Sequence, residues 1–165
     1  MPMVVPSSGE GNEEEKEKII TDEDVIYAEV MNDPRLLTLL LYLRKRPAPF
    51  NKLLRILEIP RSTFIKLLKR LQRTGLIEKC MGVDGRRRYY KLTKRGRRIA
   101  SSCRDTILST LKRHGSEYED GRHVRIEKRK FNEILEEVFG ISPSLFEDTF
   151  VWREHGYYDY LLRRG

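Results

Sequence analysis

Apolar side chains recur at helical spacing in the first part of the chain, and polar start signals divide them into two helices. Thr21 stands before three acids, which favour the positive end of a helix dipole, and it predicts a helix over 22–31. Asp33 followed by Pro34 predicts a second helix that ends near Arg46. This second helix is apolar nearly all round, so it must be covered on more than one side. Either the helix over 22–31 or a second subunit must supply part of that cover.

Two shorter helices follow, with a tight turn between them. The prolines in 47–49 end the preceding helix, and apolar residues at helical spacing predict a helix over 50–57. A short connection at 58–60 leads into a helix over 61–73. Gly75 stops this helix, as glycine commonly does just past a helix end.

Two segments of alternating apolar and polar residues come next, at 76–81 and 87–92. The residues between them include Asp84 and Gly85, a pair that predicts a β-hairpin turn. A threonine then caps a long helix over 94–114. Helix, short helix, turn, helix, hairpin and helix is the order of elements in a winged helix domain.

The two ends of the chain differ from this middle part. The segment 1–18 is rich in Pro, Ser, Gly and Glu, so we expect it to be disordered. After a polar linker at 116–121, a helix is expected over about 127–139, and another beginning at Ser142 or Ser144. The tail carries aromatic side chains that we expect to complete a small C-terminal core: Phe146, Phe150, Trp152, Tyr157, Tyr158 and Tyr160.

The predicted fold class is therefore mainly α with a two-stranded β-hairpin wing. A winged helix-turn-helix domain with flanking helices, including an N-terminal helical extension, occupies 19–115. A small helical C-terminal region occupies 116–165, and a disordered acidic tail occupies 1–18.

Charge is distributed very unevenly along the chain, although the net value is only +8. Residues 1–33 carry ten acids and two bases, residues 34–114 carry 23 bases and four acids, and residues 115–165 carry eight bases and eleven acids. The three segments thus have net charges of −8, +19 and −3. This concentration of cations indicates a polyanionic partner. The alternative is a solvated surface that only keeps the protein soluble.

Three stretches of the basic segment resemble winged helix regulators of the MarR, PadR and ArsR type. LLRILEIPRST at 53–63 resembles their helix-turn-helix, and LLKRLQRTGLIEK at 67–79 resembles the end of their recognition helix and their first wing strand. DGRRRYYKLTKRG at 84–96 resembles their wing and the start of the next helix. The resemblance covers residues 50–96, and it implies a DNA-binding transcriptional regulator.

The helix over 61–73 fits the role of recognition helix, because one side is apolar and the other is cationic. At about 100° per residue, Phe64, Leu67 and Leu68 share one direction, whereas Ser62 and Lys66 lie opposite. The residues at its start are placed to reach base edges or phosphates, and the later basic residues are placed to neutralise phosphates. The expected DNA contacts are Arg61, Ser62, Thr63, Lys66, Lys69, Arg70 and Arg73.

The predicted wing adds a second cationic element. Arg86, Arg87 and Arg88 lie at or just after the hairpin turn, where a wing tip meets the minor groove or the DNA backbone. Alternation places Tyr90 and Leu92 on the core face of the second strand. A basic hairpin that merely decorates the surface is the alternative.

The helix over 94–114 has a basic start and then an apolar stripe, which suits either a helix pair between subunits or a strut packed on the C-terminal region. The stripe consists of Ile99, Cys103, Ile107 and Leu111. Regulators of the type that the chain resembles often dimerise through elements that flank the domain, so the resemblance favours a homodimer. Its two recognition helices would then read a palindrome.

Signals for other classes of protein are weak. No glycine-rich phosphate loop or zinc-protease helix is present, the three histidines are scattered, and no cofactor is expected. Cys80 and Cys103 are interpreted as small apolar fillers, with a metal-sensing site as the alternative. With no run of about 18 apolar residues and no secretory signal, we expect no membrane partner and a cytoplasmic, nucleoid-associated protein that is not an enzyme.

The sequence therefore predicts a homodimeric regulator that binds double-stranded DNA sequence-specifically. One alternative is a winged helix that serves as a protein-interaction module of a transcription, replication or repair assembly, with a protein partner bound through the C-terminal region. Another is an architectural protein that binds DNA without regard to sequence, in which the acidic tail competes with DNA for the basic surface.

Overall fold

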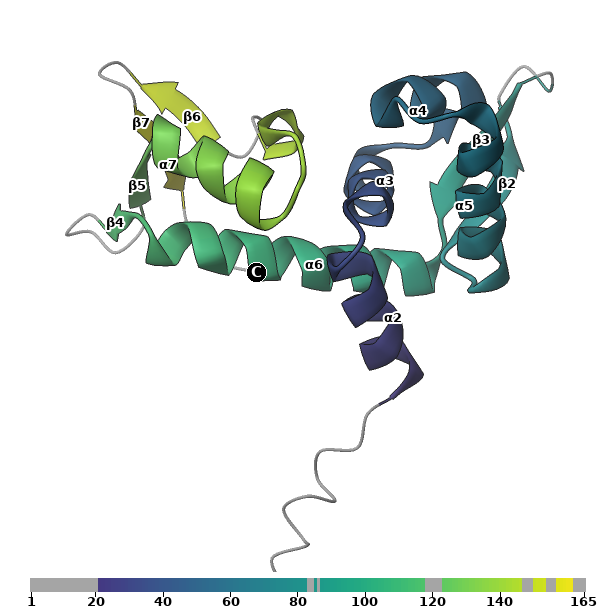
Figure 1. Ribbon diagram of the computed structural model, residues 1–165, viewed down its shortest axis with the longest axis horizontal. Coiled ribbons are helices and arrows are strands. Elements are labelled where there is room, and N and C mark those ends of the chain that lie inside the picture. The colour runs from purple at the N-terminus through teal and green to yellow at the C-terminus, as the bar shows by residue number, and fades with distance from the viewer. Residues whose placement is uncertain are drawn as a thin grey trace, which may run out of the picture.

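The long helix α6 joins two groups of elements, the winged helix at one end and a second sheet at the other (Figure 1). The computed structural model describes residues 21–82, 85, 87–117, 123–146, 150–153 and 157–161. The helices are α2 (Asp22–Met31), α3 (Pro34–Lys45), α4 (Phe50–Leu57), α5 (Arg61–Arg73), α6 (Lys94–Arg113) and α7 (Lys128–Glu133), with a π-helix η1 (Ile134–Val138) and a 3-10 turn η2 (Pro143–Phe146). The strands are β1 (Ala48–Pro49), β2 (Ile77–Met81), β3 (Arg88–Leu92), β4 (Ser116–Glu117), β5 (His123–Glu127), β6 (Phe150–Arg153) and β7 (Tyr157–Leu161).

Three helices begin at the polar residues that the sequence singles out. Before α2, the Thr21 hydroxyl accepts a hydrogen bond from the Asp24 backbone N–H at 3.1 Å, and the Asp24 carboxylate accepts one from Thr21 N–H at 3.0 Å. Asp33 caps α3, and Thr93 caps α6 by accepting from the Gly96 N–H at 3.0 Å. Each cap satisfies backbone N–H groups that have no partner inside the helix.

The helix-turn-helix is made by α4 and α5, and both helices have the bounds expected from the sequence. The turn between them requires Glu58 in the left-handed region, with φ 54° and ψ 44°. Such a conformation costs a non-glycine residue about 1 kcal/mol. After α5, Gly75 takes a positive φ of 76°, which confirms its predicted role in ending the helix.

The wing is an antiparallel sheet with strand order β1-β3-β2. Ile77 pairs with Leu92 at its base, and Met81 pairs with Arg88 toward the tip. Tyr90 and Leu92 are buried, as the alternation predicts. The expected hairpin thus exists, and the two-residue strand β1 adds a third strand at its edge.

Helix α3 is surrounded by other elements of the same chain. Leu37, Leu39 and Leu40 have no exposed surface. Helices α2, α4 and α6, strand β3 and the turn η2 all contact α3. The cover that its apolar surface requires is therefore supplied without a second subunit.

The apolar stripe of α6 is buried in its own chain. Ile99 and Cys103 lie among α2 and α3, and farther along the helix contacts β4 and β5. This burial agrees with the expected strut, although α6 packs on α2 and α3 as well as on the C-terminal region. Gly96 is required near its start, because a Cβ there would lie 2.0 Å from the Leu76 carbonyl oxygen.

The expectation of a small helical region at 116–165 is only partly right, because a four-stranded antiparallel sheet with order β4-β5-β7-β6 also lies there. Its strands are short, and aromatic and β-branched residues, which favour strands, dominate β6 and β7. We assigned these aromatics to a C-terminal core and missed their strand preference. Of the aromatic set, Phe146 is buried, whereas the side chains of residues 150–165 lie outside the part of the chain that can be described.

A single helical segment formed by α7 and η1 confirms the helix expected over 127–139. The second expected helix is only the turn η2. Ile141, Leu145 and Phe146 around this turn are buried in the same apolar cluster as α3. The C-terminal elements therefore share a core with the winged helix.

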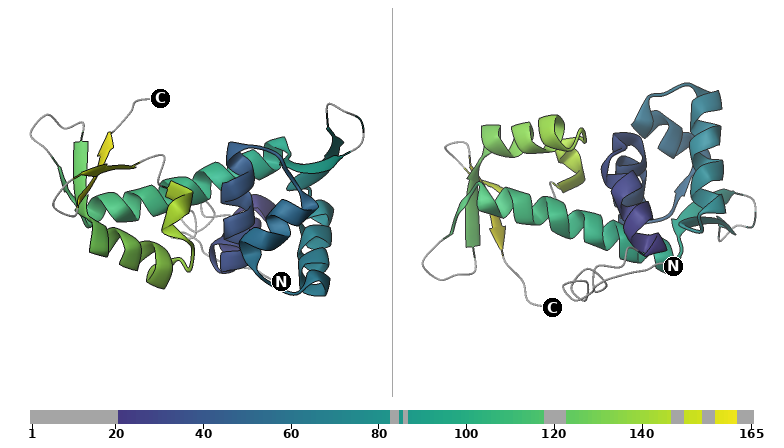
Figure 2. Two further views of the ribbon diagram at one scale, coloured as in Figure 1. Left: turned by 90° about the horizontal axis from the view of Figure 1, so that it is seen from above. Right: turned by 60° about the horizontal axis from the view of Figure 1, so that its bottom comes forward.

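Views from other directions show that the wing projects from the end of the molecule opposite the second sheet (Figure 2). The expected disordered tail at 1–18 lies outside the described residues. Of the helices described, none has the length and apolar character needed to cross a membrane.

Candidate nucleic-acid interface

Helix α5 has one buried and one exposed side. Phe64, Leu67, Leu68 and Leu71 are at most 5% exposed. The opposite side carries four exposed polar and basic residues, Ser62, Lys66, Lys69 and Arg73, which we call the α5 row. The structure thus confirms the amphipathic pattern of the helix, which stands beside the wing strands at one end of the molecule (Figure 1).

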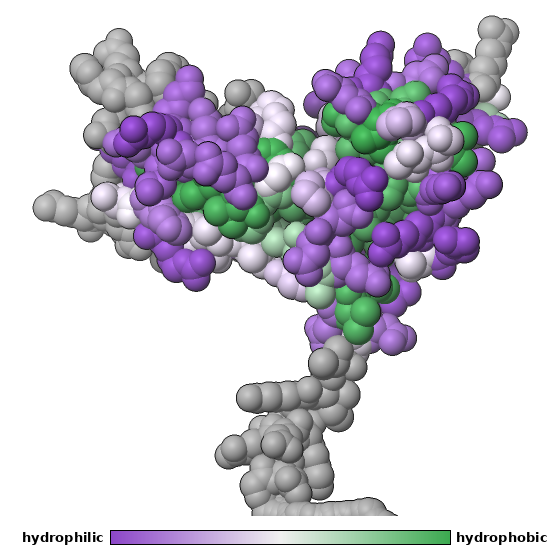
Figure 3. Space-filling model, viewed as in Figure 1, coloured by the Kyte–Doolittle hydropathy of each residue, from purple (hydrophilic) through white to green (hydrophobic). Residues whose placement is uncertain are grey.

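Among the described residues, the α5 row has no acidic partner. Neither Lys66, Lys69 nor Arg73 forms an ion pair with any residue that the structure describes. On the face drawn in Figure 3, hydrophilic side chains surround an apolar patch at this end of the molecule. An unpaired cationic row on a protruding helix is the electrostatic footprint of a polyanion-binding surface.

The three remaining residues expected from α5 lie away from the row. The Arg61 guanidinium stacks on the Phe50 ring, 4.8 Å from its centroid. Arg70 lies 3.5 Å from the Glu29 carboxylate of α2. Thr63 is half-buried. The set expected from the sequence therefore groups residues that face in different directions.

The wing carries Arg87 and Arg88, both exposed. Arg88 begins β3 opposite Met81, whose side chain is 57% exposed. Arg86, the first arginine of the predicted set, lies outside the described residues. The two described arginines are thus on the projecting part of the wing.

Helices α4 and α5 begin differently from the other long helices. Their N-cap residues are Pro49 and Pro60, which provide no side-chain hydrogen bond, and neither helix has an acid in its first turn. The N–H groups at these ends carry the positive end of the helix dipole. Such ends are suited to anions, including phosphate.

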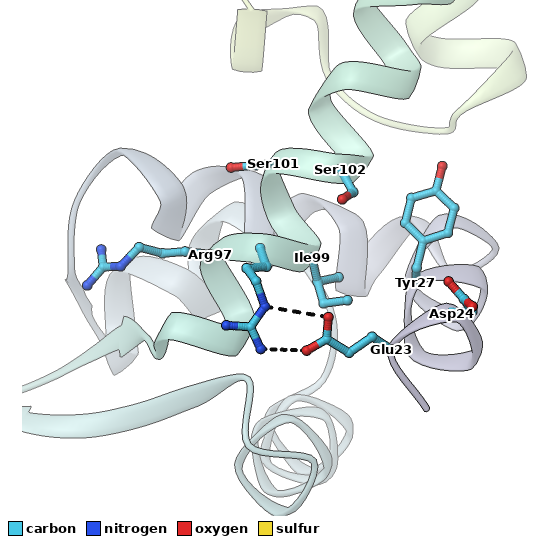
Figure 4. Close-up of a pocket in the computed structure, with 8 residues that line it drawn as sticks. Glu23, Asp24, Tyr27, Arg97, Ile99, Ser101 and Ser102 are labelled. Carbon is cyan, nitrogen blue, oxygen red and sulfur yellow. Dashed lines mark hydrogen bonds and ion pairs between the residues drawn. The ribbon is translucent and has the colours of Figure 1, made fainter. Parts of the chain in front are cut away.

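Acids of α2 pair with cations elsewhere on the domain. Glu23 lies 2.5 Å from the Arg98 guanidinium and 3.9 Å from that of Arg95, beside a shallow cavity of about 660 Å³ between α2 and α6 (Figure 4). The hydrogen bond from Arg98 lowers the pKa of Glu23 below its ordinary value. Together with the pair formed by Glu29 and Arg70, these contacts attach α2 to α6 and α5 and leave the α5 row uncovered.

The cysteines differ in their surroundings. Cys103 is completely buried in α6, and burial raises the pKa of its thiol to about 12, so it is an apolar filler as expected. Cys80 is half-buried on β2. Within the described ranges, no group of three or more His, Cys, Asp or Glu side chains is placed to hold a metal ion.

Comparison with known families agrees with this arrangement. The profile of the HxlR-like helix-turn-helix family matches residues 35–123, which is more than half of the chain and runs from α3 to the start of β5. The chain belongs to this family. Together with the wing, this confirms the winged helix-turn-helix class that the sequence resembles.

Several solved structures are similar to part of this HxlR-like protein. A mutant of ZitR from Lactococcus lactis is 22% identical, with a TM-score of 0.42, and the match covers 55% of this chain and 64% of ZitR. A probable transcriptional regulator from Pseudomonas aeruginosa is 23% identical, with coverage of 55% and 72% and a TM-score of 0.44. CouR, a transcriptional repressor solved with a 23-mer DNA duplex, is 21% identical, with coverage of 60% and 71% and a TM-score of 0.44. No curated protein matches the chain.

Sequence reasoning missed Phe50 as part of this surface. Its apolar character marked it only as a core residue, and its contact with Arg61 joins two different helices. The available signal was the position of these two residues, because Phe50 begins α4 and Arg61 begins α5.

Proposed function

We propose that the protein binds double-stranded DNA sequence-specifically as a homodimer, with α5 in the major groove. The observation that carries this proposal is the α5 row, an exposed cationic side of the recognition helix without an acidic partner among the described residues. Membership of the HxlR-like family supports it.

The residues have different proposed roles. Ser62 and Lys66, nearer the start of α5, read base edges, whereas Lys69 and Arg73 neutralise phosphates. Arg87 and Arg88 contact the minor groove or the backbone beside it, and we extend this role to Arg86. The positive ends of α4 and α5 supply further phosphate contacts.

A homodimer is proposed because one helix reads only a few base pairs. Two recognition helices placed about 34 Å apart would read two half-sites on one face of the duplex. The apolar sides of α3 and α6 are buried within the chain, so the contact between subunits must use other surfaces. Such a regulator would act in the cytoplasm, at the nucleoid.

The test is binding of the purified protein to a random-sequence duplex and to genomic fragments across a salt series. Tight, salt-sensitive binding to a few preferred fragments is expected, with a two-to-one ratio of protein chains to duplex. Uniform binding to all fragments would instead identify an architectural protein. Absence of binding at moderate salt would favour a protein-interaction module.

Two variants test the assigned surfaces. Lys66→Ala should weaken binding to the preferred duplex by about tenfold, since a good base contact is worth about 1–3 kcal/mol. Arg87→Ala should weaken binding to every duplex equally and reduce the salt dependence. Arg129→Ala serves as the matched control. It removes an exposed charge, which lies 3.6 Å from the Glu127 carboxylate, on a helix far from α5 (Figure 1). Unchanged binding by the first two variants would refute this docking geometry.

A further inference from the structure

Three side chains form a stack that runs from the core to the surface between α4 and α5. Phe64 of α5 has no exposed surface. The Phe50 ring meets it edge to face, with centroids 4.9 Å apart and planes at 65°. The exposed Arg61 guanidinium then covers the Phe50 ring at 4.8 Å. The buried Phe64 ring therefore supports the half-buried Phe50 ring, and Phe50 in turn supports the exposed Arg61 guanidinium.

The stack turns Arg61 away from the α5 row. At about 100° per residue, Arg61 lies only about 60° round the helix from the buried Phe64, whereas Ser62, Lys69 and Arg73 cluster about 140–180° from it. The contact with Phe50, the first residue of α4, directs the Arg61 guanidinium to the junction of the two helices. A side chain held there lies beside the groove-facing row and not on it.

Helix stability does not account for an arginine at this position. A cation in the first turn opposes the helix dipole, and α5 has no acid in that turn to offset it. No described carboxylate pairs with Arg61 either. Its charge is therefore available to a partner outside the chain.

We propose that Phe50 is a positioning residue that holds Arg61 ready to bind one DNA phosphate at the junction of α4 and α5. Arg61 then contributes affinity without reading sequence. Holding the guanidinium in place before binding reduces the conformational entropy that it loses on contact with DNA. This inference rests on the proposed function, and it decides between the two roles, base reading and phosphate binding, that the sequence leaves open for Arg61.

The binding test is a double-mutant cycle, measured by fluorescence anisotropy with the preferred duplex and a random duplex. Arg61→Ala should weaken both by the same factor and lower the slope of log affinity against log salt by about one. Phe50→Leu should weaken binding by about two- to fivefold, the usual value of an exposed cation–π contact, and should have no effect when Arg61 is already alanine. Phe50→Tyr keeps the aromatic face and should restore wild-type affinity.

A second measurement requires no DNA. The Arg61 side-chain protons should show an upfield ring-current shift by NMR in the wild type and in Phe50→Tyr, and should lose it in Phe50→Leu. Leu54→Met, at another half-buried position of α4, is the control for a general change in packing, and it should leave both the shift and the cycle unaltered.

Several outcomes would overturn the inference. If Phe50→Leu weakens DNA binding by the same factor in the wild type and in Arg61→Ala, the Phe50 ring contributes to packing and does not position Arg61. Loss of discrimination between duplexes in Arg61→Ala would make Arg61 a base reader. If the wild type binds its preferred duplex more tightly than the random one, and Arg61→Ala binds both as tightly as the wild type does, only this inference fails. If the wild type binds neither duplex, the proposed function is refuted as well.

Discussion

The helices of the scaffold and those of the helix-turn-helix begin in different ways. Thr21, Asp33 and Thr93 cap α2, α3 and α6 with side-chain hydrogen bonds. Helices α4 and α5 follow Pro49 and Pro60 and have no such bond. A good cap is worth about 0.5–2 kcal/mol, so its omission from both helices of the motif gives up stability at the ends that face the proposed ligand.

Packing compensates for the missing caps. Leu53 of α4 and Phe64 of α5 are completely buried. The α4–α5 pair is therefore held by its apolar side, while its N-cap residues, Pro49 and Pro60, supply no side-chain hydrogen bond. Side-chain caps thus occur on α2, α3 and α6 and are missing from the two helices of the motif, although the short helix α7 also lacks one.

The strongest challenge to this comparison is to cap α5. Pro60→Asp supplies an acceptor and a negative charge at the start of the recognition helix. Stability should change little, because the new cap, worth about 1 kcal/mol, is offset by the loss of proline rigidity, worth about 0.4–1 kcal/mol. DNA affinity should fall by about tenfold or more, since like charges facing each other in an interface cost several kcal/mol.

Anisotropy titrations and urea unfolding would measure these two effects. Thr21→Asp is the matched control, because it adds the same charge at a scaffold cap and should leave affinity unchanged. If Pro60→Asp binds DNA as well as the wild type, the start of α5 does not lie at the duplex.

Removal of a scaffold cap should lower the stability of the fold and leave the DNA affinity unchanged. The Thr93 hydroxyl accepts from Gly96 N–H and donates to the Gly75 carbonyl at 2.5 Å. Thr93→Ala should therefore destabilise the fold by about 1–2 kcal/mol in urea unfolding, and the folded variant should keep its DNA affinity. Thr93→Ser retains both bonds and should behave as the wild type. Loss of affinity without loss of stability in Thr93→Ala would contradict the division between scaffold and motif.

The smallest effect concerns pH. Hydrogen bonds from the Thr21 backbone lower the pKa of Asp24 below its ordinary value of 3.8. The stability contributed by Asp24 is therefore present above that value and is lost as pH falls through the lowered pKa. The difference in urea midpoint between the wild type and Asp24→Asn should disappear in strong acid. A difference that persists there would show that the charge of the carboxylate is not the cause.

Local signals account for the part of the fold that the sequence predicts. Caps at Thr21, Asp33 and Thr93 and the stop at Gly75 depend on neighbouring residues, so they are readable without the structure. The second sheet depends on pairing between strands distant in sequence, such as β5 with β7, and its strands have at most five residues. Tertiary pairing of this kind leaves only a weak trace in a single sequence.

The candidate site shows the same limit. Periodicity identified the α5 row, because Lys66 and Lys69 lie opposite Phe64 on a regular helix. It also sets Arg61 about 60° from Phe64 and so off the row, but it could not show what holds Arg61 and Arg70, since their partners, Phe50 and Glu29, lie on other helices. Contacts between elements decide which member of a basic helix is free for a ligand.

The strut α6 has one further consequence. With 20 residues it is about 30 Å long, and on its own it would act as a lever between the wing and the second sheet. The turn η2 against α3 braces it, because Gly140 packs so tightly on Pro34 that a Cβ there would come within 2.8 Å of the proline ring. Helix α6 and the turn η2 both contact α3, so the two ends of the molecule share one apolar core. We therefore expect the molecule to unfold in one cooperative transition, as thermal or urea unfolding would measure.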